Sequence, residues 1–446
     1  MEIFIMAAQL IMGLSLLVGL HELGHFAFAK FFGIRVDKFY IFFDFLFPIS
    51  KGRTFALFKK KIGGTEYGMG WLPLGGYVKI HGMVDETQNG DDLHGEPARD
   101  EFRGKPTWQR LLVMAGGVGV NVVTGIVIFA SLAYAHGVEY LPADAVPGGV
   151  VTSALGRQVG LRNGDQVVGL NGQPLVEFDQ LYNPEVLSRP GTYLTVERQG
   201  RRVDLPAFPA SFFGQLAAAD TAYVSPRKPF TIAAVVPGEP AEAAGLQAGD
   251  RICFVNERPI AYFDEMQTEL ARYPKQAVQI TVERAGKPVV VRAVVKENGK
   301  IGLRAKTELV SKTHRFSLVE ALPQGVKQAA AVLRLQALGI GKLFVGEVSA
   351  SDSMAGPVEI AQQFGGAWDW PHFWDLCAQL SMVLAFMNLL PIPGLDGGHI
   401  VFLLYEIVSG RKPAIRVLQG AQRVGALLVL SLMMYVLVVK QIMKFL

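Results

Sequence analysis

Three residues of the kind that catalyse metal-dependent hydrolysis lie inside an apolar stretch near the start of the chain. The stretch GLSLLVGLHELGHFAFAKFFG covers residues 13–33 and contains His21, Glu22 and His25. On a helix, residues four apart lie on one face about one turn apart, so the two imidazoles can bind one metal ion. Glu22 then lies beside a water on that ion and can accept its proton. The spacing predicts a catalytic zinc site on an apolar helix.

The composition is typical of a membrane protein, because 50% of the 446 residues are hydrophobic and 18% are charged. Residues 3–20 carry no charge, and further apolar runs follow Gly119, Asp375 and Gly425. We expect four transmembrane helices, within 1–30, 109–136, 372–400 and 422–446. Histidine and glutamate are costly in hydrocarbon and persist mainly where they line a wet cavity or do chemistry, which favours a metal site over two incidental histidines.

A candidate third ligand follows the third apolar run, in the segment MNLLPIPGLDGGHI at residues 387–400. Its prolines and glycines must break the helix at membrane depth, which is tolerated only where the backbone is buried in protein or lines a cavity. Asp396 is the carboxylate at this break, at a depth similar to that of His21. We expect His21, His25 and Asp396 to bind one zinc ion per chain. His399, beyond two glycines, is the competing ligand.

The distribution of basic residues predicts the orientation in the membrane. Lysines and arginines gather after the first span, including the run at 59–61, whereas only Glu2 precedes it. By the positive-inside rule, segments 31–108 and 401–421 are cytoplasmic. Both termini and the segment 137–371 then lie on the outer side of the membrane. The basic run lacks interleaved aromatics and fits a topology signal or a contact with anionic lipid, so no nucleic-acid partner is expected.

The outer segment contains an internal repeat. GLRNGDQVVGLNGQPL at 160–175 aligns without gaps with GLQAGDRICFVNERPI at 245–260, and a VER strand follows each copy at nearly the same distance. The pattern resembles the permuted PDZ domains of bacterial proteases. That resemblance implies two α/β domains, at 137–222 and 223–309, each with a groove that can bind a peptide as an added strand. Neither copy has an obvious carboxylate-binding loop, and spacer domains are the alternative.

Taken together, HELGH, NLLPIPGLDGG and the tandem repeats between the second and third spans resemble the site-2 protease family of intramembrane zinc metalloproteases. The resemblance covers nearly the whole chain. It implies that His21, His25 and Asp396 are zinc ligands and that Glu22 is the catalytic base. It also implies cleavage of single-span membrane proteins within their transmembrane segment, as in regulated intramembrane proteolysis during envelope stress. The implied substrates are an anti-sigma factor already trimmed on the outer side, or remnant signal peptides.

Two further motifs are candidate substrate-binding elements. The segment GMGWLPLGGYVKIHG at 68–82 alternates bulky and small residues around a glycine pair and predicts a β-hairpin. By the resemblance, this membrane-associated region pairs with an unwound substrate; a purely structural hairpin is the alternative. Asn388 is an amide that either holds the substrate or satisfies carbonyls freed by the prolines. The candidate substrate residues are therefore Asn388, Gly68, Gly70, Gly75 and Gly76.

The remaining segments complete the expected fold. The glycine-rich stretch 115–125 predicts close helix packing, and we expect no chemical role for Asn121. Within the linker 310–371, residues 356–368 read as an amphipathic stretch at the membrane surface. The expected fold class is a polytopic α-helical membrane protein with four transmembrane helices, a membrane-associated β-hairpin region and two tandem periplasmic PDZ-like domains.

Three functions compete for this fold. The first is a zinc endopeptidase whose PDZ-like domains act as a size filter for substrates. The second is an inactive membrane adaptor that holds partners through those domains, and the presence of Glu22 argues against it. The third is a metal transporter, which predicts ion-binding residues distributed along several spans rather than gathered at one depth.

Overall fold

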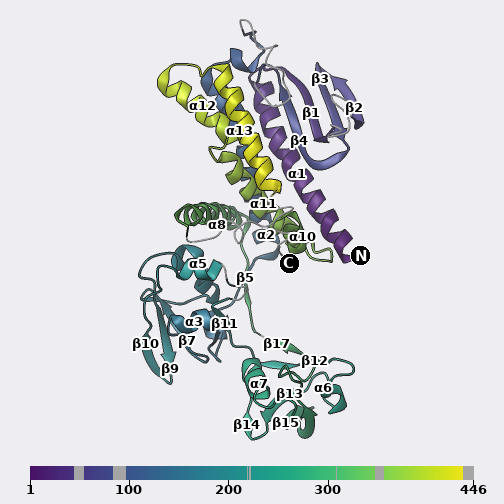
Figure 1. Cartoon of the computed structure of the whole chain (residues 1–446), viewed down its shortest axis with the longest axis vertical. Coiled ribbons are helices and arrows are strands. Elements are labelled where there is room, and N and C mark those ends of the chain that lie inside the picture. Colours follow the sequence, from purple (N-terminus) through teal and green to yellow (C-terminus); the bar gives the residue numbers. More distant parts are fainter. Residues whose placement is uncertain are drawn as a thin grey trace. The chain divides into compact units, whose positions relative to one another are not determined.

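The computed structural model describes residues 1–44, 55–83, 97–217, 219, 222–307, 309–346 and 356–434. The chain divides into two compact units (Figure 1). The helical unit comprises Met1–Gly137, Arg315–Phe344 and Ser349–Leu446, and the repeat unit comprises Val138–His314 with Val345–Val348. Each unit is built around its own buried apolar residues.

The helical unit consists of long apolar helices and one sheet. Its helices are α1 (Glu2–Phe31), η2 (Phe102–Gly104), α2 (Thr107–His136), α8 (Leu318–Val345), α10 (Pro357–Gln363), α11 (Trp370–Leu389), α12 (Asp396–Ser409) and α13 (Ile415–Met434). Among the described residues, α1 and α2 are long and apolar enough to cross a membrane. The third expected span corresponds to α11, and the fourth begins in α13, while residues 435–446 lie outside the described residues.

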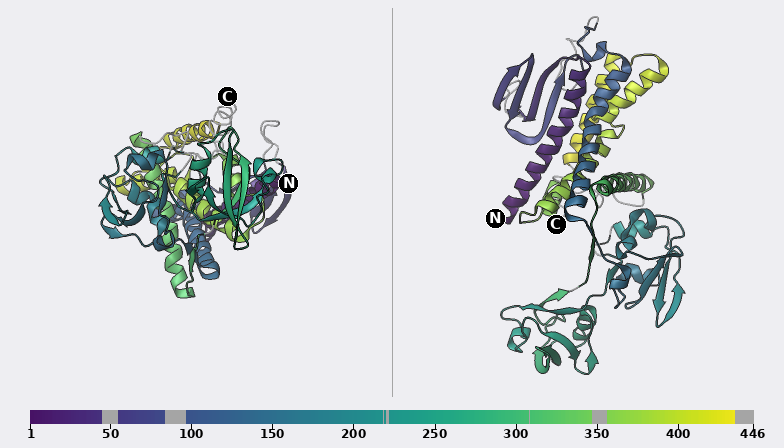
Figure 2. Two further views of the ribbon diagram at one scale, coloured as in Figure 1. Left: turned by 90° about the horizontal axis from the view of Figure 1, so that it is seen from below. Right: turned by 180° about the vertical axis from the view of Figure 1, so that it is seen from behind.

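Helix α2 packs against both α1 and α11, and Figure 2 shows it running beside α1. The crossing with α1 is close, because a Cβ atom on Gly24 would lie 2.4 Å from the carbonyl oxygen of Gly116. The prediction that the glycine-rich stretch permits close helix packing is therefore confirmed. This crossing brings α2 within reach of the histidines of α1.

The predicted hairpin at 68–82 is wrong. Strands β1 (Val36–Phe43), β2 (Ala56–Ile62), β3 (Thr65–Gly70) and β4 (Leu72–Ile80) form one sheet in the order β2-β3-β1-β4. Strand β1 lies between β3 and β4, parallel to β3 and antiparallel to β4. The glycine pair is therefore part of a continuous strand, with Gly76 opposite Ile41, rather than a turn. Alternation within 68–82 could not reveal that a strand from earlier in the chain separates its two halves.

The repeat unit contains two sheets of equivalent strand order. The first copy has β6 (Val150–Thr152), β7 (Gln166–Leu170), β8 (Gln173–Pro174), β9 (Leu194–Arg198), β10 (Arg201–Asp204) and β11 (Val224–Pro226), with η3 (Ala143–Ala145), α3 (Ala154–Gln158), η4 (Phe178–Tyr182), α4 (Pro184–Leu187) and α5 (Phe212–Ala217). The second has β12 (Phe230–Val235), β13 (Arg251–Val255), β14 (Arg258–Pro259), β15 (Ala277–Arg284), β16 (Lys287–Val294) and β17 (Leu303–Thr307), with α6 (Pro240–Ala243) and α7 (Phe263–Leu270).

The four-stranded sheets run β10-β9-β7-β8 in the first copy and β16-β15-β13-β14 in the second. Each copy adds a two-stranded pair, β11 with β6 and β12 with β17. Strands β5 (Val138–Tyr140) and β18 (Lys312–His314) pair where the chain enters and leaves the unit. The aligned segments 160–175 and 245–260 thus contain matching strand pairs, β7 with β8 and β13 with β14.

The stretch 356–368 forms α10 and the turn that follows it. Phe364 is buried against Phe373 of α11, and the side chain of Gln9 on α1 donates to the carbonyl of Gly365 at 3.1 Å. This stretch packs against α1 and α11, and its position at a membrane surface stays a prediction.

Candidate metal centre

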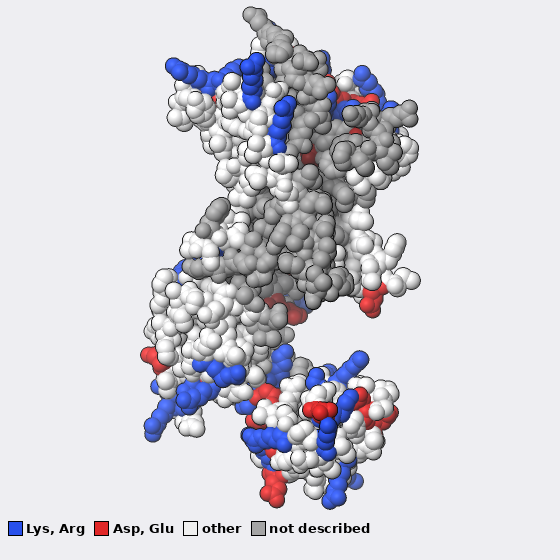
Figure 3. Space-filling model, in the orientation of Figure 1, with Lys and Arg blue, Asp and Glu red and all other residues white. Residues whose placement is uncertain are grey.

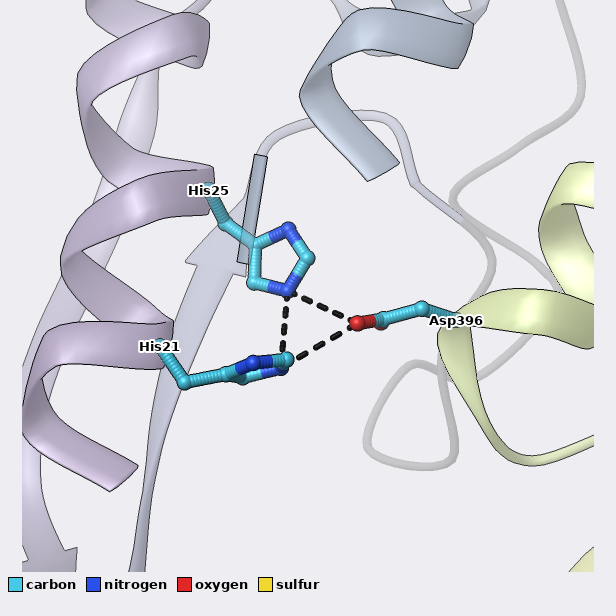
Figure 4. Close-up of side chains that lie close together, drawn as sticks. All are labelled: His21, His25 and Asp396. Carbon is cyan, nitrogen blue, oxygen red and sulfur yellow. Dashed lines mark hydrogen bonds and ion pairs between the residues drawn. The ribbon is translucent and has the colours of Figure 1, made fainter. Parts of the chain in front are cut away.

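Helix α1 presents His21 and His25 to the same side, one turn apart (Figure 4). Both are buried, with 7% and 5% of their surface exposed. Their Nε2 atoms lie 3.2 Å apart. The predicted spacing therefore brings two imidazole nitrogens to one point inside the helical unit.

Asp396 reaches that point from the break between two helices. Helix α11 ends at Leu389 and α12 begins at Asp396, and the intervening residues include Pro391 and Pro393, which cannot donate the hydrogen bonds of a continuous helix. The Oδ2 atom of Asp396 lies 3.1 Å from Nε2 of His21 and 3.1 Å from Nε2 of His25. The structure thus brings together all three predicted ligands.

The three atoms fit a tetrahedral zinc ion. Ligand atoms about 2.0–2.1 Å from zinc at tetrahedral angles are separated by about 3.3 Å, close to the sides of 3.1, 3.1 and 3.2 Å formed here. Oδ2 of Asp396 is buried, and the described part of the chain offers it no hydrogen-bond partner. A buried anionic oxygen without a donor is costly unless a cation compensates it. Two imidazoles and a carboxylate are also a donor set that zinc prefers, with a fourth position left for water.

Helix α2 forms one wall of the centre. The backbone carbonyl of Val113 lies 2.8 Å from Nδ1 of His25, so it accepts the proton of that nitrogen and leaves the Nε2 lone pair facing Asp396. Gly117, one turn further along α2, packs against the two rings. A Cβ atom there would lie 2.5 Å from Nε2 of His25, so a side chain would displace the imidazole.

Two more predicted residues lie beside this centre. Glu22 follows His21 on α1, is half-buried, and lies near the backbone of Val78 on β4. Asn388, in the last turn of α11, has its side-chain nitrogen 3.5 Å from Nε2 of His21. The structure places both residues next to the predicted ligands. Their catalytic roles stay predictions.

The competing ligand His399 lies outside the group of three. It is on α12, and its Nε2 lies 2.8 Å from the side-chain nitrogen of Gln422 on α13. Among the described residues, the group of converging metal-binding side chains consists of His21, His25 and Asp396.

The four predicted substrate glycines fall on two strands. Gly68 and Gly70 lie on β3, which is paired on both sides, and a Cβ atom at Gly68 would lie 2.3 Å from the ring of Tyr40. Packing therefore accounts for that glycine. Gly75 and Gly76 lie on β4, one of the two outer strands of the sheet, which packs against α1. Close packing also surrounds this pair, since a Cβ atom at Gly75 would lie 2.8 Å from the ring of Phe43 and one at Gly76 2.6 Å from the carbonyl oxygen of Tyr40. A substrate role remains a prediction for all four.

Sequence reasoning missed Asn121 of α2. This residue is fully buried, and its side-chain nitrogen lies 3.2 Å from Nδ1 of His21. A polar side chain inside an apolar span was the available signal, because such residues are expensive in a membrane and mark functional sites. The contact itself depends on how α2 crosses α1, which spacing along the chain does not reveal.

One protein family and its members match nearly the whole length of the chain. The model of peptidase family M50 matches residues 9–432. The regulator of sigma E protease of Haemophilus influenzae is 28% identical over 450 residues, and the regulator of sigma-E protease RseP of Escherichia coli is 27% identical over 458 residues. A Neisseria meningitidis relative with the provisional name zinc metalloprotease is 29% identical over 454 residues. Each alignment covers 96% of both chains.

Proposed function

Because the chain belongs to peptidase family M50 and is a zinc metalloprotease, we propose that it cuts single-span membrane proteins within their transmembrane segments. The observation that carries the proposal is the buried group of His21, His25 and Asp396 in a unit whose helices α1 and α2 are apolar enough to cross a membrane. A hydrolytic centre on an apolar span suits a scissile bond that is itself in the membrane.

In this proposal His21, His25 and Asp396 hold the zinc ion. When bound there, zinc supplies Lewis-acid chemistry that brings the pKa of water to about 7. Glu22 accepts the proton of the attacking water and passes it to the leaving amine. Asn388, 3.5 Å from Nε2 of His21, donates a hydrogen bond to the scissile carbonyl or the neighbouring substrate backbone.

The proposed substrate lies along β4. A transmembrane substrate arrives as a helix, whereas a protease attacks an extended chain, and an outer strand can hold that extended form by backbone pairing. Strand β4 is one of the two outer strands of its sheet and packs against α1, with Val78 near Glu22, so a peptide paired with β4 runs beside the base. Gly75 and Gly76 leave the same strand free of side chains over two residues.

The proposed substrate class follows from the relatives' names and from the repeats. Two relatives are named as regulators of sigma-E, which supports an anti-sigma factor trimmed on its outer side as a substrate, with remnant signal peptides as a second class. We propose that the two PDZ-like domains exclude substrates that still carry a bulky outer domain.

The proposed location is the bacterial inner membrane, with four spans and with the repeat unit and both termini in the periplasm. Basic side chains gather at the end of the helical unit near α12 (Figure 3), which supports a cytoplasmic position for that end. Cysteines at Lys60 on β2 and at Arg202 on β10 test this orientation in a Cys253→Ser background. We expect a membrane-impermeant thiol reagent to label Arg202→Cys in spheroplasts and Lys60→Cys only after lysis. The reverse pattern would invert the topology.

Metal removal tests the activity itself. Purified full-length chain in liposomes should cleave a model single-span substrate, lose that activity with a zinc chelator and regain it with Zn²⁺ but not Mg²⁺. Mass spectrometry of the products should map the cut within the apolar segment. Activity that persists without metal, or a cut outside that segment, would contradict the proposal.

A further inference from the structure

A buried amide on α2 faces the ring of His21 on the side away from Asp396. Asn121 is 0% exposed, and its side chain lies 3.2 Å from Nδ1 of His21. Its backbone carbonyl accepts a hydrogen bond of 2.8 Å from the hydroxyl of Ser381 on α11, which is also 0% exposed. This part of α2 is therefore fixed against both α1 and α11.

The side-chain oxygen of Asn121 is buried and has no hydrogen-bond partner among the residues that the structure describes. Buried polar atoms are nearly always paired, so an unpaired one next to a cluster of ligands needs an explanation. A half-turn of the amide about its last bond exchanges the oxygen and nitrogen. The oxygen then lies at the 3.2 Å position beside Nδ1 of His21.

The two amide orientations select different forms of the His21 ring. When the amide nitrogen faces Nδ1, that ring nitrogen acts as an acceptor and the neutral ring carries its proton on Nε2, which then cannot bind a metal. When the amide oxygen faces Nδ1, it accepts the Nδ1 proton and leaves the Nε2 lone pair directed at Asp396. Only the second arrangement suits a metal ligand.

Helix α2 also supplies a hydrogen-bond acceptor to Nδ1 of the other histidine, His25. Val113, Gly117 and Asn121 are spaced four residues apart, so they form one stripe along α2. The carbonyl of Val113 holds Nδ1 of His25 at 2.8 Å, and Gly117 lets both rings approach the helix. Asn121 occupies the equivalent position toward Nδ1 of His21.

We propose that Asn121 is a positioning residue for the metal centre: its side-chain oxygen accepts the Nδ1 proton of His21 and fixes the ring in the orientation that binds zinc. The proposal rests on the proposed function only in requiring that zinc binds at His21. Asn121 touches neither the substrate nor the metal, and acts through the imidazole.

Zinc affinity of the full-length chain in lipid nanodiscs tests this role by competition with a chromophoric chelator. Asn121→Leu keeps the approximate volume but removes the acceptor, and should weaken zinc binding by about 10–100-fold, the usual loss for a partner of a ligating histidine. Asn121→Asp keeps an acceptor oxygen and should bind zinc at least as tightly as the wild type. Ser381→Ala removes a contact to the same turn of α2 without touching His21, and should leave the affinity unchanged.

The absorption spectrum of the Co²⁺-substituted protein gives a second readout, since it reports the ligand geometry. It should change in Asn121→Leu and return to the wild-type form in Asn121→Asp. Asn121→Ala repeats the comparison with a smaller side chain if Asn121→Leu does not fold. Wild-type affinity in a folded acceptor-free variant, or equal losses in Asn121→Asp and Asn121→Leu, would overturn the role of Asn121. A wild-type chain that binds no zinc would instead overturn the proposed metal centre.

Discussion

Buried carboxylates in the two units are held in opposite ways. In the repeat unit, Asp250 is 0% exposed and accepts hydrogen bonds from Nε and Nη2 of Arg284, both at 2.7 Å, and from the backbone nitrogen of Gln247 at 2.9 Å. In the helical unit, Oδ2 of Asp396 lies 3.1 Å from two imidazole nitrogens and has no hydrogen-bond partner within the described segments. The carboxylate of Asp250 is therefore satisfied by hydrogen bonds from protein donors. The carboxylate of Asp396 instead points, together with the two imidazole nitrogens, at one position where a cation can bind.

The first copy of the repeat strengthens the contrast. Asp165 accepts two hydrogen bonds of 2.7 Å from Arg198 and one of 2.8 Å from the backbone nitrogen of Arg162. The Gly-Asp turn and the VER strand of each copy are thus joined by the same bidentate ion pair. Complete satisfaction indicates a structural role, and an unsatisfied carboxylate among histidines indicates a metal site. Structural and metal-binding carboxylates should therefore differ in what is lost when their charge is removed, stability in the first case and metal binding in the second.

The largest effect is expected at the metal centre. Asp396→Asn or His25→Ala removes a ligand, so zinc content should fall to background and cleavage should drop by more than about 100-fold, beyond the loss typical of an outer-shell partner. Elemental analysis of purified protein and cleavage in liposomes measure both. A variant that keeps full zinc content would remove its residue from the ligand set.

The corresponding change in the repeat unit should affect stability alone. Asp250→Asn weakens the charge-assisted bonds to Arg284 and should destabilise the second copy by about 1–3 kcal/mol, with zinc content unchanged. Hydrogen exchange of β13 and β15 in the full chain measures this local stability. Glu283→Gln, at an exposed ion pair with Arg251, is the matched control and should cost less than about 1 kcal/mol. Loss of zinc in Asp250→Asn would show that zinc binding in the helical unit depends on the stability of the repeat unit.

The same carboxylate predicts a pH dependence. Burial would raise the pKa of Asp250, but hydrogen bonds from Arg284 and from the backbone of Gln247 outweigh it and hold the pKa below its usual range. The charged form is therefore favoured by folding. This stabilisation is complete above the pKa of the unfolded state, about 3.9, and is lost as the pH falls through the folded-state value. Pepsin cleavage of the second copy should rise more steeply with acid in the wild type than in Asp250→Asn. Parallel profiles would contradict the expected role.

The smallest expected effect concerns substrate selection. Gly249, in the turn before Asp250, has φ +90° and open space around it, so Gly249→Val strains the backbone without a clash, at a cost of about 1–3 kcal/mol. If the PDZ-like domains filter substrates by size, loosening this turn should raise the ratio of untrimmed to trimmed substrate cleavage a few-fold. The measurement compares both rates in membranes at matched enzyme levels. Equal losses with both substrates would mean that the domains recruit substrate or support the fold.

The metal ligands could be predicted from the sequence, whereas the order of the strands could not. His21 and His25 are one turn apart on a single helix, and Asp396 lies at a break marked by prolines, so local rules predicted all three. The sheet was misread because β1 separates β3 and β4, and pairing between distant segments leaves no mark in the alternation of 68–82. The contact of Asn121 with His21 was missed for a similar reason, since it exists only where α2 crosses α1.

The central claim is that one centre combines three zinc ligands with Glu22 as the base, and one comparison tests it most directly. Zinc content and cleavage of a model single-span substrate should be measured in parallel for the wild type and Glu22→Gln. The substitution removes the proton acceptor and no ligand, so we predict full zinc content with cleavage at background. Retained cleavage in zinc-loaded Glu22→Gln would contradict the mechanism.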